Sequence, residues 1–144
     1  MNGIHEQLRA AGLRVTSPRV AVMEVLGEAQ HVSADTVAKA ARSRTGAVST
    51  QAIYNVLSDL VSVGLVHRIE PSGSPALYEL STRGTHHHLM CRECAKVVDL
   101  ACEHGTDPCI MPPKKHGFSD IEADIVFWGT CRECRTRPNR STNR

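Results

Sequence analysis

The chain has 144 residues, of which 41% are hydrophobic and 22% charged, and its formal net charge is +2. This composition is ordinary for a folded globular protein with one moderate core or two small ones, and it argues against general disorder. No apolar run reaches the roughly 20 residues of a membrane span, and the N-terminus lacks the basic and apolar regions of a signal peptide, so we expect a cytoplasmic protein without a membrane partner.

Residues 1–64 have a helical pattern. Ser17 followed by Pro18 predicts a capped helix start, and Ser33 predicts a second one. Ser49 opens a third helix, in which the apolar residues share one face: Ile53, Val56, Leu57 and Leu60.

The opposite face of this third helix is polar and uncharged, with Thr50, Gln51, Tyr54, Asn55 and Ser58. Amides and hydroxyls can pair with base edges in the major groove of DNA, and an aromatic ring can contact a thymine methyl group. The same face also suits plain exposure to solvent, so the helix alone leaves both interpretations open.

Two strand-like segments, residues 65–70 and 76–80, follow the third helix and are joined by a turn. Three helices and a hairpin are typical of a winged helix-turn-helix domain, which favours DNA reading. Basic side chains are then candidates for phosphate contacts that fix the register: Arg14, Arg19, Arg42, Arg44 and Arg68.

The second half of the chain is predicted to be strand-rich. Residues 96–100 and 121–128 have strand patterns, and prolines in residues 102–117 argue against a long helix there. Strand alternation predicts His86 and His88 on one face and His87 on the other.

Two CxxC pairs, Cys91 with Cys94 and Cys131 with Cys134, are separated by 36 residues. Four thiolates are the usual ligands of a closed, tetrahedral structural zinc, and without a secretion signal a disulfide framework is disfavoured. The histidine run just before Cys91 suggests a second, more exchangeable metal that prefers imidazole and carboxylate ligands.

Two further cysteines, Cys102 and Cys109, leave two interpretations open: inert thiols or a thiol redox switch. The basic residues 135–144 contain no large apolar side chain, so we predict a disordered tail.

The order of these motifs resembles the ferric uptake regulator family of metal-dependent bacterial repressors. The resemblance covers about residues 5–134 and rests on matched positions: Arg14 to Arg19, His31, Ser49 to Leu57, Tyr78 with Glu79, His86 to Cys94, and Gly129 to Cys134.

The family resemblance implies an α+β fold. Residues 1–82 would form the N-terminal winged helix-turn-helix domain, 83–134 a small α/β dimerisation domain with the four-cysteine zinc site, and 135–144 the tail. It implies a homodimer that binds palindromic double-stranded operator DNA, with contacts from Arg14, Arg19, Ser49, Thr50, Gln51, Tyr54 and Asn55.

The resemblance also implies a regulatory metal site with the ligands His31, Glu79, His86, His88 and Asp99. These nitrogen and oxygen donors suit Fe²⁺ or Mn²⁺, although Zn²⁺ can substitute. Metal binding would clamp the two domains and allow operator binding.

Asp99 indicates the kind of regulator. Peroxide-sensing members typically carry aspartate at this position, whereas iron-uptake regulators carry glutamate. The chain further resembles the actinobacterial branch that controls catalase-peroxidase and related oxidative-defence genes, in which peroxide oxidises a ligand of bound iron. The alternative is an iron- or zinc-uptake regulator of the same family without peroxide sensing.

The chain departs from the family at several positions. Asn55 replaces the usual arginine after the recognition-helix tyrosine, and Thr85, His87 and Ala123 replace ligands of an additional metal site found in some members.

Other classes of protein fit less well. The chain has no HExxH motif, and neither CxxC pair lies in a thioredoxin-like context, so we predict that it is not an enzyme. A zinc-stapled interaction module would explain the cysteines but not the polar helix face and the hairpin.

Overall fold

The computed structural model describes residues 3–71, 73–81, 86–101, 112–121, 123 and 125–137, except for the side chains of His86 and Ala101. The chain divides into two compact units, Met1–Thr82 and Arg83–Arg144. None of the helices in the described ranges is long and apolar enough to cross a membrane.

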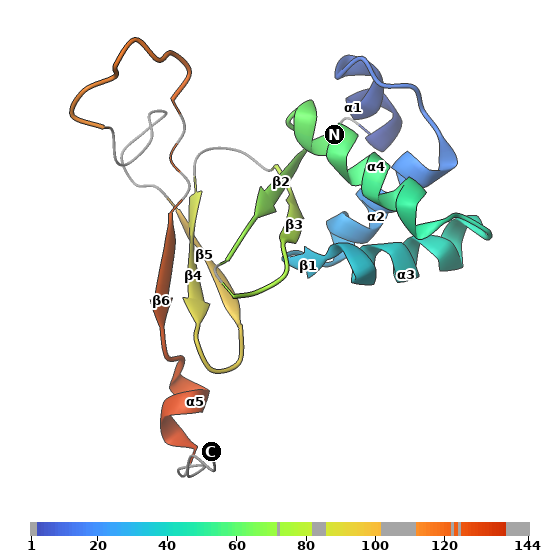
Figure 1. Cartoon of the computed structure of the whole chain (residues 1–144). Coiled ribbons are helices and arrows are strands. Elements are labelled where there is room, and N and C mark those ends of the chain that lie inside the picture. The colour runs from blue at the N-terminus through green and yellow to red at the C-terminus, as the bar shows by residue number, and fades with distance from the viewer. Residues whose placement is uncertain are drawn as a thin grey trace. The chain divides into compact units, whose positions relative to one another are not determined.

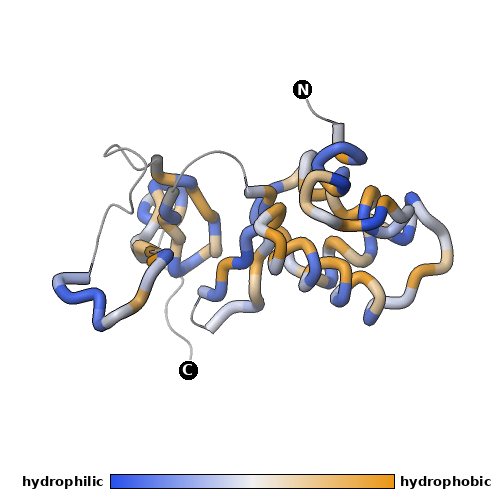
Figure 2. The backbone as a smooth tube through the Cα atoms, turned by 90° about the horizontal axis from the view of Figure 1, so that it is seen from above, coloured by the Kyte–Doolittle hydropathy of each residue, from blue (hydrophilic) through white to orange (hydrophobic). Residues whose placement is uncertain are grey.

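Four helices form most of the first unit (Figure 1). They are α1 (Ile4–Ala10), α2 (Ser17–Glu28), α3 (Ala34–Thr45) and α4 (Thr50–Ser62). Hydrophobic and hydrophilic residues alternate along them (Figure 2), as expected for helices that bury one side.

Polar side chains cap these helices. Ser33 Oγ accepts from the N–H of Thr36 at 3.3 Å, and Ser49 Oγ accepts from Ala52 at 3.0 Å, so both predicted starts are confirmed. The predicted cap at Ser17 is wrong by one residue. The N-cap of α2 is Thr16, whose hydroxyl accepts from Arg19, and Ser17 already belongs to the helix.

The wing consists of β2 (Val66–Ile69) and β3 (Leu77–Leu80), an antiparallel hairpin that confirms the predicted one with shorter strands. A two-residue strand, β1 (Val32–Ser33), pairs with the other edge of β3, so the sheet order is β1-β3-β2. The sequence does not predict β1, because a two-residue strand is too short to show an alternation of apolar and polar residues.

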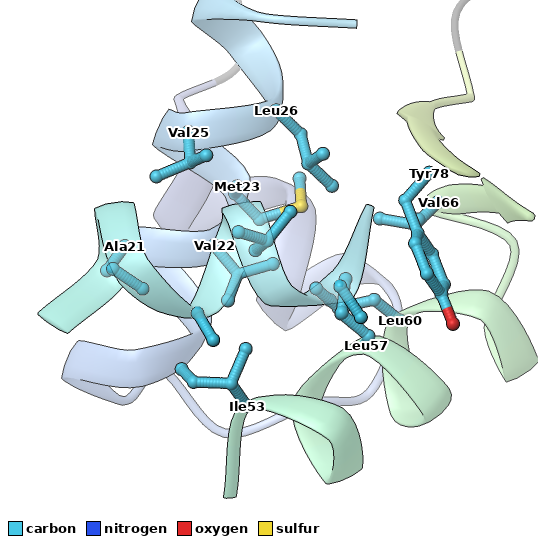
Figure 3. Close-up of a cluster of buried hydrophobic side chains, with 14 of the residues drawn as sticks. Ala21, Val22, Met23, Val25, Leu26, Ile53, Leu57, Leu60, Val66 and Tyr78 are labelled. Carbon is cyan, nitrogen blue, oxygen red and sulfur yellow. The ribbon is translucent and has the colours of Figure 1, made fainter. Parts of the chain in front are cut away.

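The apolar face of α4 lies at the centre of the core. Ile53, Leu57 and Leu60 are fully buried, and Leu60 lies beside the wing residues Val66 and Tyr78 (Figure 3). Because helix and wing share this core, it fixes the orientation of the exposed face of α4.

The second unit contains a three-stranded sheet of mixed direction. The central strand β4 (His86–Cys91) is antiparallel to β5 (Val97–Ala101) and parallel to β6 (Val126–Gly129), and the short helix α5 (Arg132–Thr136) follows. The overall architecture is the α+β one that the sequence predicts.

The predicted strand over residues 121–128 is wrong in its first half, because β6 begins only at Val126. The parallel register pairs His88 with Val126. Among the described residues, Ile121 and Ala123 have no strand partner.

The predicted tail boundary is also wrong. Arg135 and Thr136 belong to α5, whose last turn is held by the N–H of Arg135 on the carbonyl of Cys131 at 3.0 Å. Residues 138–144 lie outside the described ranges. So do Cys102 and Cys109, while residues 112–121 contain no helix, in agreement with their prolines.

Truncation of Leu57 should destabilise the first unit. The substitution Leu57→Ala removes fully buried methyl groups and should cost about 2–5 kcal/mol of its free energy of unfolding. The exposed Val63→Ala is the control and should change it by less than about 0.5 kcal/mol. Urea unfolding followed by helical circular dichroism measures both, and equal losses would contradict this core.

Candidate metal centres and nucleic-acid interface

The outward face of α4 is exposed as predicted. Gln51, Tyr54 and Asn55 are exposed, and Thr50 is half-buried. The face is ordered by its own contacts, because Gln51 Nε2 donates to Asn55 Oδ1 at 3.0 Å and Arg42 donates to Thr50 Oγ1 at 2.6 Å. Polar side chains of this face therefore form hydrogen bonds within the unit.

Tyr54 has a partner that the sequence analysis did not assign. Its hydroxyl donates to Asp35 Oδ1 in the first turn of α3 at 2.7 Å. This hydrogen bond is the largest cause that raises the pKa of Tyr54, and burial and the charge of Asp35 act in the same direction. No local sequence pattern signals a contact between residues on two different helices.

The predicted phosphate-binding arginines differ in their surroundings. Arg14 is exposed, whereas Arg19 donates to the carbonyl of Arg14 at 2.8 Å and to Asp59 Oδ2 at 3.1 Å. Arg19 therefore also links α2 to the C-terminal half of α4.

Two other arginines of this group pair with carboxylates. Arg44 bonds to Glu24 and Glu28 of α2, and Arg68 pairs with Glu70 at 2.6 Å. Their charges are partly neutralised within the unit, so Arg14 is the more available phosphate contact.

The four cysteines of the CxxC pairs converge. The Sγ atoms of Cys91, Cys94, Cys131 and Cys134 all lie within 4.8 Å of one another, and those of Cys94 and Cys131 are 3.7 Å apart. Four thiolates about 2.3 Å from a tetrahedral zinc ion would be separated by about 3.8 Å. The cluster thus fits a structural zinc site.

Backbone geometry shapes both cysteine clips. Ala95, directly after Cys94, has a left-handed conformation with φ of 62°, and its N–H donates to the carbonyl of Cys91 at 3.0 Å. The second clip begins at the N-cap of α5, where the N–H of Cys131 donates to Cys91 Sγ at 3.3 Å.

The thiols influence each other's ionisation. The N–H of Cys131 is the largest cause that lowers the pKa of Cys91 to about 6, whereas the neighbouring thiol of Cys131 raises the pKa of Cys134 to about 12. One thiolate forms readily, and further thiolates are opposed by its charge. A divalent cation would remove this repulsion, which agrees with a metal-binding role.

In the first unit, His31 and Glu79 form an imidazole–carboxylate pair. His31 Nε2 lies 2.9 Å from Glu79 Oε2, and Glu79 is only 1% exposed. His31 has a left-handed φ of 59°, a strained conformation for a residue other than glycine and one that is common at functional sites. The turn into β1 sets this conformation.

In the second unit, His88 and Asp99 form a similar pair. They are opposite each other on β4 and β5, with His88 Nε2 3.4 Å from Asp99 Oδ1. His88 is 1% exposed, whereas Asp99 is half-exposed. His86 lies in β4 as predicted, but its side chain is outside the described part of the structure.

Each of the two pairs has a spacing that suits two ligands of a metal ion. Two ligands about 2.1 Å from one ion are separated by about 3.0 Å in octahedral and about 3.4 Å in tetrahedral geometry. The separations of 2.9 Å and 3.4 Å match this range. Each unit therefore carries one nitrogen and one oxygen donor at a suitable spacing.

His87 differs from its neighbours in the histidine run. It is buried, and neither ring nitrogen has a hydrogen-bond partner among the described residues. Its strand partner Leu100 is apolar, and Ala123 offers no ligand atom. Within the described residues His87 joins no metal cluster, and Thr85 lies outside them.

A sequence profile of the ferric uptake regulator family matches residues 10–127. The chain belongs to the ferric uptake regulator family. The "Transcriptional regulator FurA" of Mycobacterium tuberculosis is 44% identical over 129 residues, covering 90% of this chain and 88% of that protein.

Solved structures of ferric uptake regulators have the same fold. The regulator of Pseudomonas aeruginosa with manganese is 28% identical, has a TM-score of 0.66, and is matched over 90% of this chain and 98% of that one. The Helicobacter pylori regulator has a TM-score of 0.70 at 22% identity, over 92% and 89% of the two chains, and supports the fold alone.

Membership of the ferric uptake regulator family establishes the general function. The chain is a metal-dependent, DNA-binding transcriptional regulator and not an enzyme, and proteins of this family are typically dimers. Its four-cysteine cluster fits a structural zinc site.

Loss of one clip cysteine should release the structural zinc. Because three thiolates cannot close the site, Cys94→Ser protein should hold nearly no zinc after dialysis, and its second unit should lose strand signal in circular dichroism. The matched control, Cys102→Ser, should keep one zinc per subunit. Retention of zinc by Cys94→Ser protein would contradict the assignment.

Zinc retention should also depend on pH. Protons compete with zinc for the thiolates, so zinc affinity should fall as the pH is lowered. A competition titration against a chromogenic chelator between about pH 8 and 5 measures this dependence, and a constant affinity would argue against thiolate ligands.

Proposed function

We propose that this regulator is a repressor that senses peroxide through ferrous iron and controls oxidative-defence genes of the catalase-peroxidase type. Its regulatory site would consist of His31, Glu79, His86, His88 and Asp99. The observation that carries the proposal is the presence of one imidazole–carboxylate pair in each unit, at distances suited to ligands of a single ion.

The position of His31 and Glu79 suggests how metal binding would affect the winged-helix unit. His31 directly precedes β1, and Ser33 at the end of β1 caps α3. Glu79 lies on β3, which pairs with β1 through Val32 and Tyr78. Ligation of both residues would fix one edge of the winged-helix unit.

The proposed regulatory ion would then join the winged-helix unit to the dimerising unit. A homodimer fixed in this way presents two α4 helices at a constant separation, which matches a palindromic operator. Without the ion, each winged-helix unit must be ordered on binding, and this lowers operator affinity.

The donor set favours iron or manganese. Imidazole and carboxylate ligands suit these ions, and the Pseudomonas aeruginosa relative was solved with manganese. When bound, ferrous iron would activate the peroxide, and the two electrons that reduce it would come from the imidazole ring of a ligand. The oxidation would add one oxygen atom to a histidine ring and convert the peroxide to water, and a modified ring is a poorer ligand.

Peroxide sensing in this proposal depends on Asp99, because it is the shorter carboxylate typical of the sensing branch. A second candidate is a zinc-responsive regulator. It is favoured by the 3.4 Å separation of His88 and Asp99, which suits four-coordinate zinc. A third candidate is an iron-uptake regulator without peroxide sensing, whose DNA binding would not respond to peroxide.

Anaerobic binding to DNA from upstream of the protein's own gene should depend on the regulatory metal. Fluorescence anisotropy of zinc-loaded protein should show binding with Fe²⁺ or Mn²⁺, and equimolar peroxide should abolish it only with Fe²⁺. Mass spectrometry should find one added oxygen atom on a peptide containing His31, His86 or His88.

The matched variant is Asp99→Glu. It should still bind this DNA with either metal but should lose at least about tenfold in peroxide sensitivity. Unchanged sensitivity would contradict the role of Asp99. Peroxide sensitivity with Mn²⁺ as well would point to Cys102 and Cys109, and activation by zinc alone would favour the zinc-responsive regulator.

One face of the second unit's sheet is a suitable dimer surface. Leu89 is opposite Val98 on one side and Phe127 on the other, and these apolar side chains are 38%, 44% and 47% exposed. A row of exposed apolar residues across three strands is typical of an interface. We place the homodimer contact there.

Phe127→Asp should therefore convert the zinc-loaded dimer to a monomer, because it buries a charge in the contact. Phe118→Asp is the control: Phe118 is 73% exposed but lies outside the sheet, so its substitution should leave the dimer intact. Light scattering after size exclusion measures the mass, and a dimeric Phe127→Asp protein would exclude this face.

A further inference from the structure

The hydroxyl group of Tyr54 is committed to a protein acceptor. It donates to Asp35 Oδ1 at 2.7 Å, while Tyr54 as a whole remains 38% exposed on the outward face of α4. The pKa of Tyr54 is raised, first by this hydrogen bond, so the phenol keeps its proton at neutral pH. The proton therefore points at Asp35.

This arrangement limits what Tyr54 can recognise. A phenol has a single O–H donor. Once Asp35 accepts it, the oxygen offers only lone pairs. In the major groove such an oxygen matches the amino groups of adenine and cytosine, and it is repelled by guanine N7 and O6, thymine O4 and phosphate oxygens.

The exposed ring adds a second preference. The edge of an aromatic ring can contact the methyl group of thymine, and an A·T pair presents an amino group and a methyl group together. An A·T pair therefore satisfies both the oxygen and the ring of Tyr54, whereas a G·C pair offers no methyl group.

We propose that Asp35 is a specificity-determining residue: it accepts the only hydroxyl proton of Tyr54, and Tyr54 therefore reads an A·T pair through an acceptor oxygen and its ring. This inference rests on the proposed role of α4 in the major groove. Asp35 acts through Tyr54 and is a positioning residue that need not touch DNA.

A purely structural role for Asp35 gives a different expectation. If the bond only tied α3 to α4, its loss would weaken binding to every DNA sequence by a similar factor. If it sets the hydrogen-bonding character of Tyr54, its loss changes which base is preferred at one position of each half-site. The base-preference profile separates these roles.

The experiment is a selection from a pool of randomised duplexes with full-length protein loaded with zinc and manganese. Wild type should enrich A·T over G·C at one position per half-site by about fivefold, the discrimination expected of one hydrogen bond. Tyr54→Phe should reduce this enrichment while keeping the ring. This variant leaves Asp35 in place, so it tests base recognition by the Tyr54 hydroxyl group even if a variant at Asp35 misfolds.

Two variants at Asp35 complete the test. Asp35→Ala frees the hydroxyl to donate, so the enrichment should fall below about twofold, with other positions unchanged. Asp35→Asn keeps an acceptor oxygen for the hydroxyl and should retain the wild-type profile. Glu6→Gln, which removes an exposed charge from α1, controls for general electrostatics and should also match wild type.

Several results would overturn the inference. An unchanged profile for Tyr54→Phe excludes base reading by the hydroxyl, and an unchanged profile for Asp35→Ala excludes control by Asp35. A uniform loss across all sequences for Asp35→Ala assigns it a structural role. If wild-type protein itself selects no sequence, the proposed DNA-reading function of α4 also fails, so the two failures are distinguishable.

Discussion

The carboxylate of Glu79 lies on a wing strand with 1% of its surface exposed, and its oxygen is 2.9 Å from the imidazole of His31. A buried charge costs several kcal/mol unless a partner compensates for it. The arrangement around this pair follows from that cost: the left-handed turn at His31, the two-residue strand β1, and the pairing of Val32 with Tyr78 all hold the imidazole against Glu79. A buried ion pair is weak evidence for a stabilising role, so the pair is a candidate functional site.

In the second unit, the four-cysteine cluster lies at the ends of the strands. The zinc cluster joins the ends of β4 and β6 because Cys91 closes β4 and Cys131 follows β6. A small sheet with little apolar core gains most from such a staple. The clip of Cys91 and Cys94 lies in the turn between β4 and β5, so it also holds the register that places His88 opposite Asp99. The structural metal site thus stabilises the strand that carries ligands of the proposed regulatory one.

Sequence patterns predicted the features that depend on nearby residues. These features are the apolar face of α4, the caps at Ser33 and Ser49 and the CxxC clips. Each is defined by residues that lie close together in the sequence. The patterns failed where long-range pairing decides the structure: β6 begins at Val126, which pairs with His88 of β4, and no local signal reports that start. The Tyr54–Asp35 contact likewise joins two helices. The proposed regulatory ligands were predicted from family resemblance and not from spacing.

The proposed regulatory site requires that His31 and His88, from different units, bind a single ion. Electron paramagnetic resonance can count Mn²⁺ bound to zinc-loaded protein in wild type and in His31→Ala and His88→Ala variants, with His5→Ala as a control. A shared site predicts one bound ion per subunit in wild type and the control, and a loss of roughly tenfold or more in affinity in each single variant, because each removes a ligand of the same ion. If His31→Ala binds Mn²⁺ as tightly as wild type while His88→Ala does not, the two pairs are independent and the clamping account is wrong.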